Sequence, residues 1–211
     1  MARFTYLYDL APDWRDPEVN NALRQLWRDP FFYVLASAAL AWAVLGGFGW
    51  VAALFTVGCV ALALVDLRTM LLPDVFTYGL ALLALVAGPQ SWPLALGGAA
   101  VAGGLFWAIR WFYVWRTGQP GMGLGDVKLM AMLGLWVGPG GLLLILLASS
   151  LLAIPVMLAR HLIQPEHTGE PMPYGPFLLA SGWLAFAYGG SLFTGLLCAR
   201  EVLLRVLQLH S

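Results

Sequence analysis

The sequence predicts an all-α fold, a polytopic membrane helix bundle of about seven transmembrane helices, with six to eight compatible with the pattern. Of 211 residues, 61% are hydrophobic and only 10% are charged, whereas soluble domains carry about 25% charged residues. Four blocks of 29 to 35 residues contain no Asp, Glu, Lys or Arg: 31–65, 75–109, 129–159 and 171–199. A spanning helix needs roughly 20 apolar residues, so blocks of this length favour pairs of helices.

The chain opens with a mixed-charge head, residues 1–30, which we expect to lie on the cytoplasmic side, ahead of a transmembrane domain at 31–211. The stretch "PEVNNALRQLWRD" (17–29) fits a short amphipathic helix on the membrane surface, with Leu23, Leu26 and Trp27 on one side. A solvated tail leading into the first span explains the same residues equally well.

Glycine and proline divide the apolar blocks into single spans. The dividing stretches are "GGFG" (46–49), "GPQSWP" (88–93) and "GPGG" (138–141). The predicted spans are 31–46, 50–66, 75–88, 93–114, 126–138, 141–160 and 176–190. An eighth at 192–208 is interrupted by Arg200, Glu201 and Arg205, so a continued or interfacial helix is the alternative there.

The distribution of basic residues orients these spans. The three dividing stretches carry no charge from 46 to 49, 88 to 92 and 138 to 141, and most basic residues fall on the opposite side. Because positive residues favour the cytoplasm, the segments near 66–74, 115–126 and 161–175 are predicted to be cytoplasmic. The net charge is zero, which gives no support for a nucleic-acid partner.

Three acids border the apolar blocks at this cytoplasmic rim: Asp66, Asp74 and Asp126. An ionisable group at the membrane costs several kcal/mol unless it is paired, hydrated or functional. Asp66 ends the second span and Asp126 opens the fifth from the same side. The topology therefore puts both at one depth, where they could form a carboxylate pair.

Two neighbouring aspartates share a proton, because both cannot easily ionise. The ionised one draws a proton from water while the protonated one polarises an amide carbonyl, with no metal or other cofactor. Gly121, Gly123 and Gly125 precede Asp126, and glycine lets the backbone approach an extended peptide closely. We expect all three to form non-helical backbone beside the site.

Structural explanations compete with this one. Asp126 and Asp74 each begin an apolar helix, where an aspartate is commonly an N-cap; capping is favoured for Asp74, which follows Pro73. Asp66 is harder to explain in this way, because a helix C-terminus disfavours an anion. Lys128 and Arg68 could be cytoplasmic anchors or could bind the substrate.

The remaining polar residues are assigned structural roles. The group His161, Glu166 and His167 does not have the spacing of a helical metal site, and a solvated loop is favoured. Ser149 and Ser150 are expected to bond to their own helix backbone. Glycine and alanine pairs in the fourth span, such as Gly98 and Ala102, are expected to let helices pack closely. Both cysteines, Cys59 and Cys198, are expected to be buried.

Three stretches, "DLRTMLLPD" (66–74), "GMGLGDVKLMAMLGLWVG" (121–138) and "PMPYGPFLLASGW" (171–183), resemble in order and spacing the type IV prepilin peptidases. These are intramembrane aspartyl proteases with a GxGD signature. The resemblance implies that Asp66 and Asp126 are the catalytic pair. It also implies a location in the bacterial inner membrane, among membrane lipid, and cleavage of prepilin or pseudopilin precursors of type IV pili or type II secretion after a glycine at the cytoplasmic face.

The chain departs from the family pattern in two places. Longer members carry paired CxxC motifs in a loop between their first two spans, where this chain has only "GGFG", so the methyl transfer of many members is doubtful here. Members often have an acid where Arg68 stands. Alternative functions are a proton-coupled transporter, a non-catalytic scaffold subunit, or a GxGD protease of the signal-peptide-peptidase or presenilin type. The acids of a transporter are expected nearer the middle of the membrane. Proteases of the signal-peptide-peptidase or presenilin type have a tyrosine directly before the first aspartate, whereas Val65 precedes Asp66 here.

Overall fold

The computed structural model describes residues 21, 24–26, 28–46, 49–163 and 172–189, and these form helices and connecting turns with no strand among them. The helices are α2 (Pro30–Leu45), α3 (Gly49–Thr69), α4 (Asp74–Ala87), α5 (Trp92–Thr117), α6 (Leu124–Val137), the short η2 (Pro139–Gly141), α7 (Leu142–Ile163) and a helix at 175–189. The all-α prediction is therefore confirmed.

Each predicted span corresponds to a helix whose observed start differs by one or two residues. α3, α5 and the segment Pro139–Ile163 are long and apolar enough to cross a membrane, whereas α2 and α4 are shorter apolar helices. The possible eighth span and most of the predicted surface helix lie outside the described residues. Residues 24–26 are helical, and Leu26 packs beside Phe32 and Val65.

The ends of the helices follow from local backbone chemistry. Gly118 ends α5 in the left-handed region at φ 78°, with its N–H bonded to the Val114 carbonyl at 2.8 Å; glycine adopts that conformation without steric cost. Met70 ends α3 at φ 54° without being a glycine. Pro73 then precedes α4 with extended backbone, so the connection from α3 to α4 is short.

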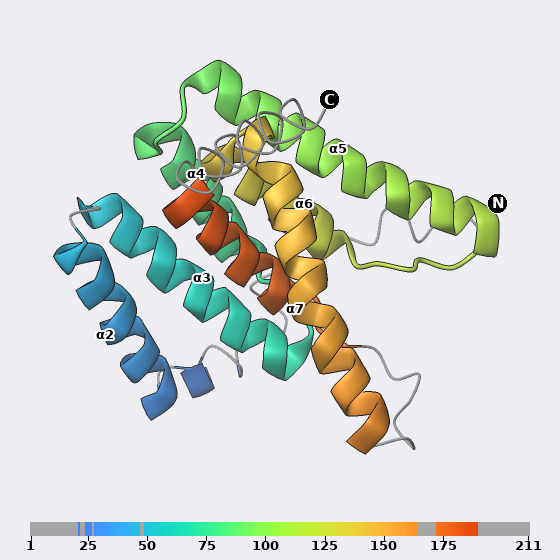
Figure 1. Cartoon of the computed structure of the whole chain (residues 1–211), viewed down its shortest axis with the longest axis horizontal. Helices are drawn as coiled ribbons and strands as arrows, with labels where there is room; N and C mark the ends of the chain where they lie inside the picture. Colours follow the sequence, from blue (N-terminus) through green and yellow to red (C-terminus); the bar gives the residue numbers. More distant parts are fainter. Residues whose placement is uncertain (1–20, 22–23, 27, 47–48, 164–171, 190–211) are drawn as a thin grey trace, which may run out of the picture.

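The centre of the bundle is α6, which packs against both α4 and α5 (Figure 1). Its Trp136 is fully buried, stacks on Phe55 with ring centroids 4.2 Å apart, and donates a hydrogen bond to the Leu80 carbonyl at 3.1 Å. Gly98 of α5 and Gly134 of α6 meet backbone to backbone, since a Cβ on either would overlap the other residue's carbonyl oxygen. The predicted packing role of the small residues in α5 is confirmed at this crossing.

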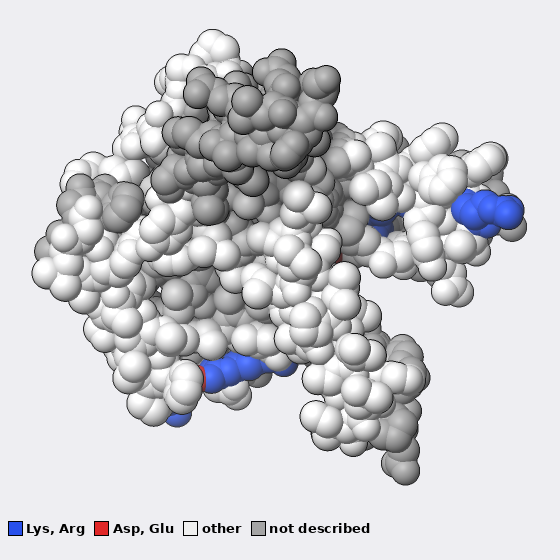
Figure 2. Space-filling view, viewed as in Figure 1, with Lys and Arg blue, Asp and Glu red and all other residues white. Residues whose placement is uncertain are grey.

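α3, α5 and α7 run in the same general direction, from upper left toward lower right in Figure 1, and the C-terminal halves of α5 and α7 project beyond the rest of the bundle. The face in Figure 2 is largely uncharged, with Lys and Arg at the end of α5 and along the lower edge. Exposed Trp92 and Trp111 lie 19 positions apart on α5, about 28 Å along a helix. That separation matches the hydrocarbon thickness between two aromatic belts.

Candidate active site

Asp66 lies in the last turn of α3, where its carbonyl accepts a hydrogen bond from Met70 N at 2.8 Å. Its side chain is buried, with only 4% of the residue exposed. The backbone N–H of Gly175 faces the carboxyl group, yet Oδ2 has no hydrogen-bond partner among the described residues. A buried carboxyl oxygen without a partner is costly, which is typical of a group kept for chemistry rather than for stability.

Asp126 occupies the first turn of α6 but is not its N-cap. The helix begins at Leu124, and its N-cap is Gly123, with no side-chain cap bond. The capping alternative for Asp126 is therefore wrong. The carboxylate turns back toward Gly123: a Cβ added to that glycine would lie 3.8 Å from Oδ2 of Asp126. At this end of the helix the backbone dipole favours an anion.

The glycines before Asp126 differ in structure. Gly121 and Gly123 are exposed and non-helical, as predicted, but Gly125 lies inside the first turn of α6, so the expectation of non-helical backbone at Gly125 is wrong. Gly121 lies against the Tyr113 ring, because a Cβ added to Gly121 would be only 2.6 Å from the nearest ring carbon. The loop is thereby held against α5.

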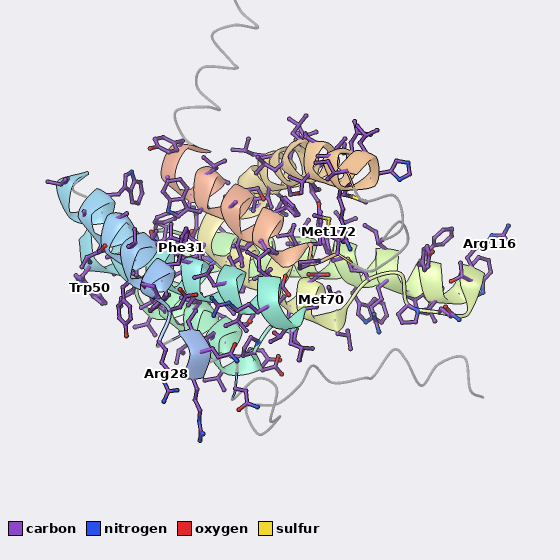
Figure 3. The ribbon with its side chains drawn as sticks, turned by 90° about the horizontal axis from the view of Figure 1, so that it is seen from below. Arg28, Phe31, Trp50, Met70, Arg116 and Met172 are labelled. Atoms are coloured by element: carbon purple, nitrogen blue, oxygen red, sulfur yellow. The ribbon has the colours of Figure 1, made fainter. Side chains whose placement is uncertain are left out.

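The two aspartates are brought together at one end of the bundle. The two carboxyls lie within range of an electrostatic interaction. Buried Leu72 packs beside a glycine next to each aspartate. Its side chain is 3.3 Å from the position that a Cβ on Gly125 would take and 3.6 Å from the position that a Cβ on Gly175 would take. Figure 3 labels Met70 and Met172, which flank these contacts in sequence. Three segments far apart in sequence thus converge around the pair.

Asp74 does not cap α4. The N-cap is Pro73, with no side-chain cap bond, so the capping interpretation is wrong. Instead both carboxylate oxygens of Asp74 accept hydrogen bonds from Lys128 Nζ, at 3.0 and 2.9 Å. The same Nζ lies 5.6 Å from the centre of the Tyr78 ring, within reach of a cation–π interaction.

Arg68 forms an ion pair with Asp29, which precedes α2. Asp29 also accepts a hydrogen bond from Phe31 N at 2.9 Å, so it caps α2. Lys128 and Arg68, for which the sequence left open an anchoring or a substrate-binding role, are thus both engaged by acids of the chain itself.

Two contributors to the site were not recognised in the sequence. Arg110 is 97% buried inside α5 and donates from Nη1 to the Met122 carbonyl in the glycine loop. Tyr174, beside Gly175, shares a 2.9 Å hydrogen bond with Ser149 of α7. The sequence signal for Arg110 is its place at the end of an uncharged block of 35 residues, where an arginine is also explained as a cytoplasmic charge.

The serine predictions are confirmed. The hydroxyls of Ser149 and Ser150 both donate to the Leu146 carbonyl, at 3.1 and 2.8 Å. Cys59 is buried as predicted, whereas Cys198 lies outside the described residues.

Within the described ranges no group of three or more His, Cys, Asp or Glu residues could hold a metal ion. His161 lies in the last turn of α7. Glu166 and His167, which complete the group considered from the sequence, are not among the described residues.

Comparison with known proteins points to one family. The model of the type IV leader peptidase family matches residues 53–158. The prepilin leader peptidase/N-methyltransferase of Aeromonas hydrophila is 39% identical over 163 residues, which cover 75% of this chain and 56% of the relative. The proteins of the same name from Xanthomonas campestris pv. campestris and Pseudomonas aeruginosa are each 38% identical, over 72% and 74% of this chain and 55% of each relative.

The chain spans about half the length of these curated relatives. No solved structure matches it.

Proposed function

Because the chain belongs to the type IV leader peptidase family, we propose that it is an intramembrane aspartyl endopeptidase that cleaves the leader of type IV prepilin-like precursors at the cytoplasmic membrane face. Asp66 and Asp126 are its catalytic residues. The observation that carries the proposal is the convergence of these two carboxyls, 60 positions apart in sequence, around Leu72, which lies beside both Gly125 and Gly175.

The two carboxyls occupy different environments, which assigns their roles. Asp126 lies in a helix's first turn, where the dipole favours the anion, and Asp66 lies in a last turn, where it is disfavoured. Asp126 therefore takes a proton from water, the water oxygen attacks the amide carbonyl carbon, and Asp66 gives its proton to the carbonyl oxygen. Asp126 then protonates the amide nitrogen, the C–N bond breaks, and Asp66 recovers a proton from the diol.

Substrate contact is assigned to the backbone at Gly121, Gly123 and Gly125, of which Gly121 and Gly123 are exposed. Arg68 keeps a proposed substrate role, since its side chain is 35% exposed beside Asp29. Lys128 is only 19% exposed and is bonded to both oxygens of Asp74, so we no longer propose it as a substrate ligand.

The proposed partners are prepilin or pseudopilin precursors and membrane lipid, in a bacterial inner membrane with the N-terminus cytoplasmic. Two features support this orientation: the uncharged connections at the opposite end of the helices, and the basic residues in the last turns of α3 and α5. Positive residues are retained on the cytoplasmic side.

One assay tests the function. The purified chain in detergent is incubated with a type IV prepilin precursor, and the product is measured by mass. We expect loss of the leader with wild type and with Ser150→Ala, which alters an exposed hydroxyl bonded to its own helix. No cleavage is expected with Asp66→Asn or Asp126→Asn. Near-wild-type turnover by either aspartate variant would refute the assignment.

A further inference from the structure

A bidentate ion pair joins α6, which carries Asp126, to the first residue of α4, the helix that follows the turn after Asp66. Asp74 is the first residue of α4, and Lys128 lies in the second turn of α6, two positions after Asp126. The hydrogen bonds from Lys128 Nζ are 3.0 and 2.9 Å long. No other ion pair between α4 and α6 occurs in the described part of the chain.

The location of this pair couples it to both carboxyls. Asp66 is followed by the turn at Met70 and by Leu72, and the turn ends at Asp74. Leu72 contacts Gly125, the neighbour of Asp126, and Gly175, the neighbour of the Asp66 carboxyl group. Fixing Asp74 to Lys128 therefore fixes the far end of the turn in which Leu72 packs beside Gly125 and Gly175, the glycines next to the two aspartates.

The pair is more enclosed than an ordinary surface ion pair. The side chains of Lys128 and Asp74 are 19% and 24% exposed, and the ammonium lies over the Tyr78 ring at 5.6 Å. In the pair between Arg68 and Asp29 the arginine side chain is more exposed, at 35%, whereas the aspartate is 15% exposed. Exposed pairs contribute little, but loss of one partner from an enclosed pair leaves a charge that must turn toward water.

We propose that Asp74 and Lys128 are positioning residues that hold the two aspartates at their reacting distance. The inference rests on the proposed peptidase function and adds a role for two residues that touch neither substrate nor water in the reaction. Misplacement of reacting groups by about 1 Å can cost on the order of 100-fold in rate. The pair should therefore act on turnover and leave substrate binding unchanged.

The test measures kcat and KM for prepilin cleavage by Asp74→Asn, by Lys128→Gln, and by the double variant that exchanges the two charges, Asp74→Lys with Lys128→Asp. We expect each single variant to retain measurable activity, with kcat reduced about 10- to 100-fold and KM unchanged. The charge-exchanged protein should have a kcat above that of either single variant, since it restores an ion pair.

Trp136→Phe is the matched control. It removes a hydrogen bond between the same two helices, ten positions from Asp126 and so about 15 Å along α6. It should lower the thermal midpoint while kcat and KM stay at wild-type values. If the single variants resemble Trp136→Phe, with lower stability and unchanged kcat, the pair is only structural and the proposal is wrong.

The remaining outcomes are also decisive. A folded charge-exchanged protein no more active than the single variants would overturn the positioning role. If a neutral variant fails to fold, Lys128→Arg and Asp74→Glu are measured instead. Both keep the opposite charges but change the length of the pair, so kcat should fall while KM stays unchanged, and an unchanged kcat in both would also overturn the role. Complete loss of activity in folded Asp74→Asn would instead make Asp74 a candidate for the first catalytic aspartate. Absence of cleavage by wild type would refute the proposed function, and the inference with it.

Discussion

Gly175 lies directly against the carboxyl group of Asp66. A Cβ at this position would overlap Oδ2 of Asp66 and would also come within 3.6 Å of Leu72. Gly175 begins the helix at 175–189 and is buried, so its backbone N–H faces the carboxyl from a helix N-terminus. The requirement for glycine here is one of space, because no side chain fits between this helix and Asp66.

Gly175→Ala should displace the Asp66 carboxyl and reduce peptidase activity at least about 10-fold, with destabilisation of about 1–3 kcal/mol from overpacking. Kinetic assays and thermal unfolding in detergent measure both. Gly189→Ala is the matched control in the same helix, since no atom of the described residues lies within 4 Å of the position that a Cβ would take there. Equal activity of the two variants would show that Gly175 is not constrained by Asp66.

The two aspartates should differ in their effect on stability. Asp66→Asn removes a buried carboxyl whose Oδ2 has no described partner, and we expect it to raise the free energy of unfolding by about 1–2 kcal/mol while abolishing cleavage. Asp126→Asn loses a favourable anion at a helix N-terminus, and we expect a decrease of about 0.3–1 kcal/mol. Thermal midpoints of both inactive variants test this; a lower midpoint for Asp66→Asn than for Asp126→Asn contradicts it.

The hydrogen bond between Ser149 and Tyr174 should hold the segment that presents Gly175. Tyr174→Phe and Ser149→Ala should each cost about 1 kcal/mol, and the double variant should cost little more than either, because both lose the same 2.9 Å bond. A double-mutant cycle by thermal unfolding measures the coupling. Additive losses would mean that the contact does not contribute to stability.

Gly98→Ala should destabilise the fold strongly, since the new methyl group would overlap the Gly134 carbonyl oxygen at the α5–α6 crossing. We expect about 3 kcal/mol or more, as for other severely strained core substitutions. Gly104 lies in the same helix, and no described residue comes within 4 Å of the position that its Cβ would take, so Gly104→Ala should stabilise by up to about 1 kcal/mol. Thermal midpoints in one detergent compare the two; similar midpoints would argue against the close crossing.

Methyl transfer is not expected from this chain. Its two cysteines, Cys59 and Cys198, form no CxxC motif, and the resemblance implies that methylating members carry such motifs in pairs. Incubation with labelled S-adenosylmethionine and a processed pilin should give no labelled N-terminus. The prepilin leader peptidase/N-methyltransferase of Aeromonas hydrophila serves as the positive control, and labelling comparable to that control would disprove the prediction.

The sequence by itself determined the helices and placed the acids at their ends. Uncharged blocks interrupted by Gly and Pro are local signals, and they located α2 to α7 and the helix at 175–189 to within a few residues. The GxGD motif and the acid at the end of α3 selected Asp66 and Asp126 because an ionisable group is costly at a membrane. The capping interpretations failed at both Asp74 and Asp126. For Asp74 another partner was available, and for Asp126 the helix begins earlier than expected.

Only the tertiary structure decided which side chains meet. Lys128 and Asp74 are 54 positions apart, and Ser149 and Tyr174 are 25 apart. In a soluble helix an apolar stripe shows which face is buried, but helices such as α3 and α5 are apolar on all sides. Their rotation about their own axes is set by close contacts such as Gly98 with Gly134, since lipid and protein interior are equally apolar. The contact between Gly175 and Asp66 depends on that rotation, which the sequence pattern leaves open.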